Sequence, residues 1–151
     1  MTNKIKDTPN DSSVEDYLNS LDEQSAKESR VLIKMMQEIS GHEPKMWNIG
    51  TIGFDNYHFK YLSGREGDSQ VISFYPRKGK LTVYLMDGTA HYSESLARLG
   101  KHTITGYCIN VKQLSDIELS VLEGIVRQSY DFIKLQSKNG PIDRILWQTE
   151  K

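Results

Sequence analysis

Cationic side chains recur in the turns that this sequence predicts, each near a glycine or a proline. Arg65, Arg77, Lys101 and His102 lie in such turns. Arginine holds a carboxylate or a phosphate through two parallel hydrogen bonds, and glycine lets a ligand approach the backbone closely. We therefore predict that these four residues contact an anion. The alternative is that their charges are solvated or paired within their own turns, and no Walker-type or dinucleotide-binding glycine pattern accompanies them.

A second polar set follows from strand alternation. In residues 57–61, 81–85 and 107–112 apolar and polar residues alternate, so each predicted strand places its polar side chains on one face. If the apolar sets pack on helices, the polar sets share the other face. His58 and Lys112 would then form the floor of the anion site, unless this face is an ordinary solvent-facing side of a sheet. The polar set comprises His58, Lys60, Thr82, Tyr84, Cys108, Asn110 and Lys112.

The N-terminal part of the chain carries an acidic ridge. It includes Glu15, Asp16, Asp22 and Glu23, and between positions 11 and 28 only Lys27 opposes the acids. Carboxylate oxygens are the ligands that hard cations prefer, so the ridge is a candidate for weak iron binding. No histidine lies among these acids, which argues against a high-affinity metal cage. The alternative is a solvated helix face, because the helix dipole favours acids near helix N-termini.

Catalytic chemistry has little support in the sequence. Cys108 would act as a nucleophile only if His102 or His58 lay close enough to favour its thiolate. A lone cysteine in a strand is more often a small buried hydrophobic residue. The four histidines show no metal-binding spacing such as H-E-x-x-H, so a metal hydrolase is not indicated. We predict no catalytic residue, and a non-enzymatic role is favoured over an enzymatic one.

Composition narrows the class of protein. The 151 residues fit one domain, and 19 basic against 20 acidic residues create no overall field that would attract nucleic acid or a membrane. No apolar run approaches the roughly 18 residues of a membrane span, and the polar N-terminus lacks a signal peptide's apolar stretch. A single cysteine excludes an internal disulfide. We therefore expect a cytoplasmic protein without nucleic-acid or membrane partners, whose oligomeric state the sequence leaves open.

The elements that must position these side chains follow from periodicity and turn residues. A flexible leader at 1–12 precedes one domain at 13–137, and a C-terminal tail covers 138–151. Two helices are predicted over 13–21 and 22–40, and a long helix is predicted to begin at a capping box formed by Ser115 and Glu118. Asp55-Asn56 is predicted to form a tight hairpin turn. Strands are predicted at 51–54, 57–61, 71–75, 81–86 and 107–112. The expected fold is α+β: a two-layer structure in which an antiparallel sheet of about five strands carries the N-terminal helices and the long C-terminal helix on one face.

The chain also resembles a known family in several short segments. They are S-V-E-D-Y-L (13–18), P-K-M-W (44–47), I-G-F-D-N-Y-H-F-K-Y (52–61), S-G-R-E-G-D (63–68), F-Y-P-R-K (74–78), L-G-K-H (99–102) and C-I-N-V-K-Q-L (108–114). In these segments it resembles the YdhG-like family of small, mostly uncharacterised bacterial proteins. The resemblance implies a frataxin-like architecture and, through it, a role in iron binding or delivery.

Three functional hypotheses follow. The leading one is a non-enzymatic protein that binds an anionic small molecule or a protein partner through the polar sheet face and the basic loops, without a cofactor. The alternative is a frataxin-like iron-binding protein that uses the acidic N-terminal helices. An enzyme with Cys108 as its nucleophile is the third.

Overall fold

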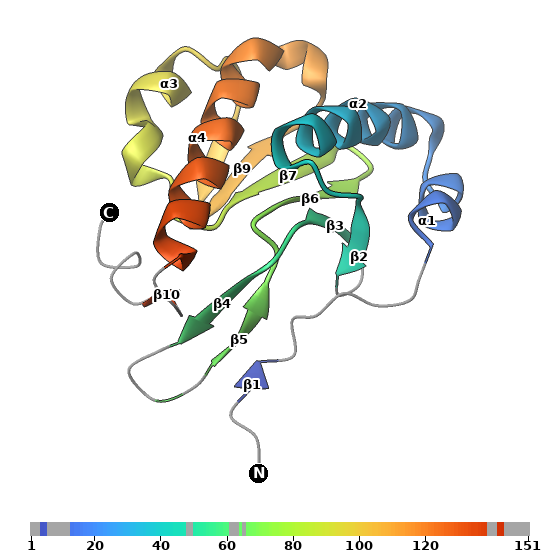
Figure 1. Ribbon diagram of the computed structural model, residues 1–151. Coiled ribbons are helices and arrows are strands. Elements are labelled where there is room, and N and C mark those ends of the chain that lie inside the picture. The colour runs from blue at the N-terminus through green and yellow to red at the C-terminus, as the bar shows by residue number, and fades with distance from the viewer. Residues whose placement is uncertain are drawn as a thin grey trace.

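The computed structural model describes residues 13–47, 50–60, 64 and 66–138, together with the pairs 4–5 and 142–143. The fold is α+β, as the sequence predicts, but the main sheet has six strands rather than about five (Figure 1). All its pairings are antiparallel. Its spatial order is β2 (Lys45–Trp47), β3 (Thr51–Phe54), β6 (Ile72–Arg77), β7 (Lys80–Leu85), β9 (Cys108–Val111) and β8 (Thr103–Thr105).

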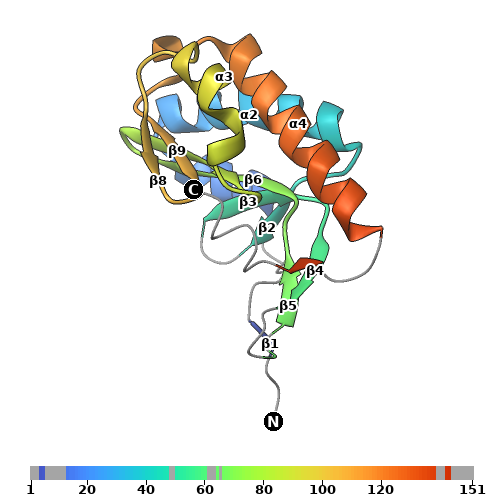
Figure 2. The same cartoon turned by 90° about the vertical axis from the view of Figure 1, so that its left-hand side faces the viewer.

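Helices α2, α3 and α4 lie on the same side of this sheet (Figure 2). The helical elements are α1 (Val14–Ser20), α2 (Glu23–Ser40), the 3-10 turn η1 (Ala90–Tyr92), α3 (Ser93–Ala97), the 3-10 turn η2 (Leu114–Asp116) and α4 (Leu119–Ser137). The first two helices begin at side-chain caps: the Ser13 hydroxyl and the Asp22 carboxylate accept backbone N–H groups of their own first turns. Gly41, at φ 71°, ends α2 in the left-handed region.

The core lies between the sheet and the helices. Strand register aligns one apolar residue from each of five strands in a single row, and every member of the row is buried. Leu32 and Met36 from α2 and Leu122 and Val126 from α4 belong to the same apolar cluster. The alternating strands therefore bury one face, as the sequence predicts. The row consists of Met46, Ile52, Phe74, Val83 and Ile109.

The turn predicted at Asp55-Asn56 is not a hairpin. β3 pairs with β2 and β6, whereas β4 (Tyr57–Lys60) pairs with β5 (Glu66–Ser69) in a second sheet. Asp55 has φ 61°, and this left-handed residue bends one long strand between the two sheets. The Asp-Asn pair therefore marks a bend, and Glu66–Ser69 form a strand that the sequence did not predict.

Two further expectations need correction. Ser115 and Glu118 do not form a capping box: Ser115 lies in η2, and α4 begins after Glu118 without a side-chain cap. β8 was not predicted, and its three residues are all exposed.

Of the predicted leader and tail, the structure describes β1 (Lys4–Ile5), Lys138 at the end of α4, and β10 (Ile142–Asp143). These strands run parallel to β5 and β4, respectively. The rest of both segments lies outside the described residues.

Candidate functional site

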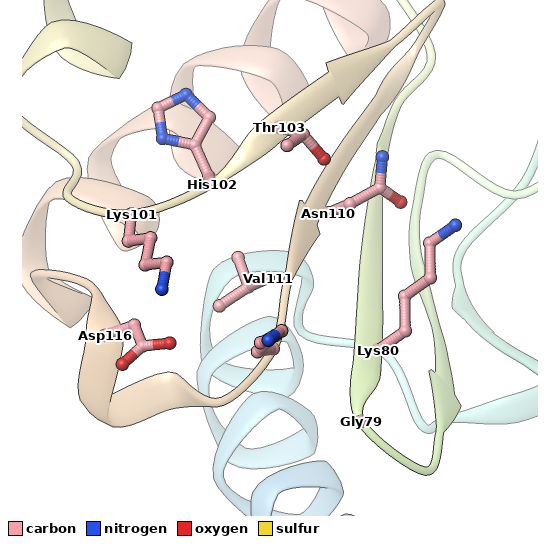
Figure 3. Close-up of a pocket in the computed structure, with 9 residues that line it drawn as sticks. Gly79, Lys80, Lys101, His102, Thr103, Asn110, Val111 and Asp116 are labelled. Carbon is pink, nitrogen blue, oxygen red and sulfur yellow. The ribbon is translucent and has the colours of Figure 1, made fainter.

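A cavity of about 380 Å³ opens at the ends of β7 and β9, where the loop before β8 and the η2 turn meet the sheet (Figure 3). Three of the predicted anion contacts, Lys101, His102 and Lys112, line it. Most of its other lining residues are polar, and one is a carboxylate. The full lining among the described residues is Gly79, Lys80, Lys101, His102, Thr103, Asn110, Val111, Lys112 and Asp116.

The sheet places cations side by side at the edge of this cavity. Arg77 on β6 is paired with Lys80 on β7. Leu81 is paired with Val111, so the same register continues to place Lys80 opposite Lys112. Like charges at opposed positions repel, and an anion between them removes that repulsion. Within the described part of the chain, neither lysine forms an ion pair, so their charges remain available.

Arg77 does not line the cavity but supports its wall. Its Nη2 donates to the Thr82 hydroxyl at 2.6 Å, and that hydroxyl donates to the Asn110 Oδ1 at 2.8 Å. The Asn110 amide nitrogen donates in turn to the Thr105 hydroxyl at 3.2 Å. The guanidinium also lies 4.4 Å from the centre of the Tyr75 ring, a cation–π contact. This chain of contacts fixes the orientation of the Asn110 amide at the cavity.

Gly100 holds Lys101 and His102 in place. It forms a β-bridge with Ile117, and the Lys101 N–H donates to the Asp116 carbonyl at 3.1 Å. Gly100 has φ 116°, and an added Cβ would lie 2.5 Å from that same Asp116 oxygen. Only glycine fits both the backbone angle and the close approach. The His102 Nδ1 lies 2.7 Å from the Gly100 carbonyl, so Nδ1 carries a hydrogen and donates it.

The η2 turn that carries Asp116 is tied to helix α2. The buried Glu28 carboxylate accepts the Leu114 N–H at 2.6 Å. Gln113 donates to one oxygen of the Asp116 carboxylate at 3.2 Å. The wall of the cavity that η2 forms is therefore fixed both to the helical layer and to the Gly100 segment.

The lining divides into two sides. Figure 3 shows the Lys101 and Asp116 side chains on one side of Val111, and Lys80 and Asn110 on the other. In the same view the His102 ring is turned away from Val111 and Asp116. His102 thus contributes to the rim of the cavity rather than to its centre.

The middle of the polar sheet face is not open to solvent. Thr82 and Asn110 share that face with Ser73, and their exposed fractions are 2%, 7% and 0%. Tyr84 and Cys108 are half-buried. The exposed part of the face is the end that carries Lys80 and Lys112, so the cationic end is where a ligand can reach the sheet.

His58, another predicted anion contact, does not line this cavity. His58 lies on β4 in the second sheet, where its Nδ1 is 2.9 Å from Asp68 and its Nε2 is 2.9 Å from Glu66. These two carboxylates raise the pKa of His58, mainly through their hydrogen bonds with the ring. Arg65 lies outside the described residues.

Two of the four acidic residues of the iron hypothesis, Glu15 and Asp22, have structural partners. Glu15 forms an ion pair with Arg30 at 2.7 Å, which lowers the pKa of Glu15. Asp22 caps α2, and Asp16 and Glu23 lie in the first turns of their helices. No group of three or more His, Cys, Asp or Glu side chains in the described residues is arranged to hold a metal ion.

Cys108 is a poor nucleophile in this environment. It is half-buried opposite Tyr84, and burial raises the pKa of its thiol. A raised pKa leaves less thiolate at neutral pH. Nothing in the contacts of Cys108 therefore favours the enzyme hypothesis.

Sequence reasoning missed Lys80, Thr103 and Asp116 as members of the site. A signal for Lys80 existed: Gly79 fixes a tight turn, and such a turn pairs the residues on either side of it, Arg77 and Lys80. No comparable signal existed for Asp116, because Gly100 brings η2 to the cavity across a separation of 16 residues.

No protein-family model, curated protein or solved structure significantly matches this chain. The resemblance to the YdhG-like family therefore stays a prediction and carries none of the argument that follows. None of the described helices has both the length and the apolar character needed to cross a bilayer.

Proposed function

We propose that this protein binds a small anion, without catalysis, in the cavity at the ends of β7 and β9. The observation that carries the proposal is the pairing of Lys80 with Arg77 and, by register, with Lys112 at an open cavity. A sheet that places like charges on three neighbouring strands carries an electrostatic cost, and a bound anion offsets that cost. Lys101 adds a further cation from the opposite wall.

The cavity also provides uncharged hydrogen-bond donors. The Thr103 hydroxyl and the Asn110 amide line the cavity together with Lys80 and Lys112. Asn110 is held by Thr82 and Thr105, so its amide is oriented before any ligand arrives. Preorganised donors bind an anion without the entropic cost of ordering them first. Anion binding by this wall is therefore supported by geometry as well as by charge.

Two other hypotheses have less support. Iron binding by the acidic helices has no metal-ligand grouping among the described residues, and Glu15 and Asp22 have structural roles. In the described part of the chain, we find no feature for docking a protein partner that is comparable to the cationic cavity. The cytoplasmic location stays part of the proposal.

Isothermal titration with inorganic pyrophosphate tests the proposal. The double variant Lys80→Gln/Lys112→Gln should weaken binding by at least about tenfold, the effect of losing one charge-assisted contact. Lys27→Gln/Lys34→Gln on helix α2 removes the same charge from exposed positions away from the cavity and should leave the affinity unchanged. Equal weakening in both variants would mean that only net charge matters, and it would contradict the assigned site.

A further inference from the structure

We infer that the ligand of this cavity is a phosphorylated polyol or sugar, with its phosphate at Lys80 and Lys112 and a hydroxyl group on the Asp116 carboxylate. The inference rests on the proposed anion site and names the class of anion. It follows from the unequal charges of the two sides of the cavity and from the acceptor capacity of Asp116.

The two sides of the cavity differ in charge. The side formed by Lys80 and Asn110 offers cations and uncharged donors, with Lys112 opposite Lys80 in register. On the other side Lys101 lies with the Asp116 carboxylate, so a positive and a negative group face the same space (Figure 3). A compact anion fits the first side. The second side suits a neutral polar group, because its own charges nearly cancel.

Asp116 has acceptor capacity that the protein does not use. Its Oδ1 accepts from Gln113, and its backbone carbonyl accepts from Lys101. Among the described residues no donor occupies its other carboxylate oxygen. A carboxylate has lone pairs to offer and no hydrogen to donate. A bare anion would be repelled there, whereas a ligand hydroxyl would donate to it.

The size and lining of the cavity also favour a phosphorylated polyol or sugar. About 380 Å³ lies at the lower end of the range typical of small-molecule sites, roughly 300–1,000 Å³, and exceeds what a single inorganic anion fills. Gly79 and Val111, which carry no polar side-chain group, also line the cavity. Apart from the His102 imidazole, which is turned toward the rim, no aromatic ring among the described residues lines the cavity, so a stacked nucleobase has no platform.

Three phosphates separate the charge from the hydroxyl groups. Glucose 6-phosphate and cyclohexyl phosphate both carry a phosphate and a six-membered ring, but only the first carries free hydroxyls, and inorganic phosphate carries no ring. Titration calorimetry should show glucose 6-phosphate binding about tenfold tighter than cyclohexyl phosphate, the value of a hydrogen bond to a charged acceptor. Unphosphorylated glucose should bind much more weakly than either ester.

The variant Asp116→Asn tests the role of the carboxylate, because it keeps the size of the side chain and an oxygen for Gln113. It should bring the two esters to nearly equal affinity and should tighten the binding of inorganic phosphate. Glu38→Gln removes one negative charge at an exposed position on α2 and should change neither result.

The possible failures are distinguishable. Equal affinities of the two esters in the wild type, or an unchanged ratio in Asp116→Asn, would overturn the assignment of a hydroxylated ligand while the anion site stands. If none of the three phosphates binds, or if glucose binds as well as its phosphate, the proposed anion site fails and the inference fails with it.

Discussion

Arg77 and Lys80 face each other across the β6–β7 hairpin, and the register that pairs them also places Lys80 opposite Lys112. Three neighbouring strands thus place cations side by side at one end of the sheet. Arg77 is turned inward to Thr82 and the Tyr75 ring, while Lys80 and Lys112 line the cavity. This division gives one cation a structural role and leaves two for a ligand.

Removing the repulsion between these lysines should stabilise the ligand-free protein. We expect Lys80→Gln/Lys112→Gln to raise the free energy of unfolding by about 0.5 kcal/mol at low ionic strength, the usual size of a cross-strand charge effect. The gain should shrink in high salt, which screens exposed charges. Urea unfolding at two salt concentrations measures both effects. A loss of stability at low salt would show that the lysines do not repel each other.

Gly100→Ala should both destabilise the fold and weaken anion binding. Its φ of 116° and the 2.5 Å approach to the Asp116 oxygen leave no room for a Cβ. We expect a loss of about 2–3 kcal/mol in the free energy of unfolding, the cost of such a strained residue together with a displaced contact. Because the same segment positions Lys101, the affinity for pyrophosphate should also fall.

The control for this substitution is Gly106→Ala. Gly106 also has a positive φ, 58°, but an added Cβ there would meet no atom within 4 Å. It should cost only about 1 kcal/mol, the strain of the left-handed conformation. If the two alanine variants lose equal stability, the contact between Gly100 and Asp116 does not constrain the site.

His58 should titrate above its ordinary value of 6.5, because Asp68 and Glu66 stabilise its protonated form. A histidine with a raised folded-state pKa contributes stability below the unfolded pKa, and this contribution is lost as the pH rises through the folded pKa. The stability difference between the wild type and His58→Gln should therefore be larger at pH 6 than at pH 9. It should stay below about 1 kcal/mol, since all three side chains are partly exposed.

Nuclear magnetic resonance titration of the imidazole checks the cause of this shift directly. Asp68→Asn/Glu66→Gln should return the pKa of His58 toward 6.5. A wild-type His58 that already titrates at or below 6.5 would contradict the ion cluster on the β4–β5 hairpin.

The buried carboxyl group of Asp87 should make the protein less stable as the pH rises. Its carboxylate is 1% exposed and accepts hydrogen bonds from Tyr92 at 2.5 Å and Ser129 at 2.6 Å. Burial, the largest cause, raises the pKa of Asp87 above 3.8. A carboxyl with a raised pKa loses its contribution to stability as the pH rises through the folded pKa.

Asp87→Asn removes that dependence because it carries no charge. Its stability relative to the wild type should therefore increase from pH 3.5 to pH 7. Asp87→Ala should be destabilised by about 2–4 kcal/mol at both pH values, since it leaves two buried hydroxyls without their acceptor. Thermal unfolding at the two pH values measures both variants, and a fall in the relative stability of Asp87→Asn over this range would contradict a buried carboxyl with a raised pKa.

Local sequence rules predicted the helices and the buried face of the sheet well. Ser13, Asp22 and Gly41 act within their own turns, so their roles as caps follow from short-range chemistry. At Asp55 local rules were not sufficient to predict the structure. Its residue type permits a left-handed backbone, but whether that conformation closes a hairpin or bends a long strand depends on pairing with Ile72 and its neighbours.

In the candidate site, too, residues placed by local patterns were predicted and residues placed by long-range contacts were not. Lys101, His102 and Lys112 were predicted from turn chemistry and alternation. Asp116 joins them only because Gly100 forms a bridge with Ile117, a contact that no local pattern predicts. His58 was placed on the same face as Lys112 because the alternation is similar, yet the bend at Asp55 puts its strand in another sheet.

The most direct measurement of the central claim is a titration of the ¹⁵N-labelled protein with inorganic pyrophosphate, followed in amide spectra. The account predicts that the amides of Gly79, Lys80, Lys101 and Lys112 shift together and saturate with one dissociation constant. It also predicts that these shifts disappear in Lys80→Gln/Lys112→Gln. Shifts confined to α1 and α2 or to the hairpin that carries His58, or no shifts at all, would contradict it.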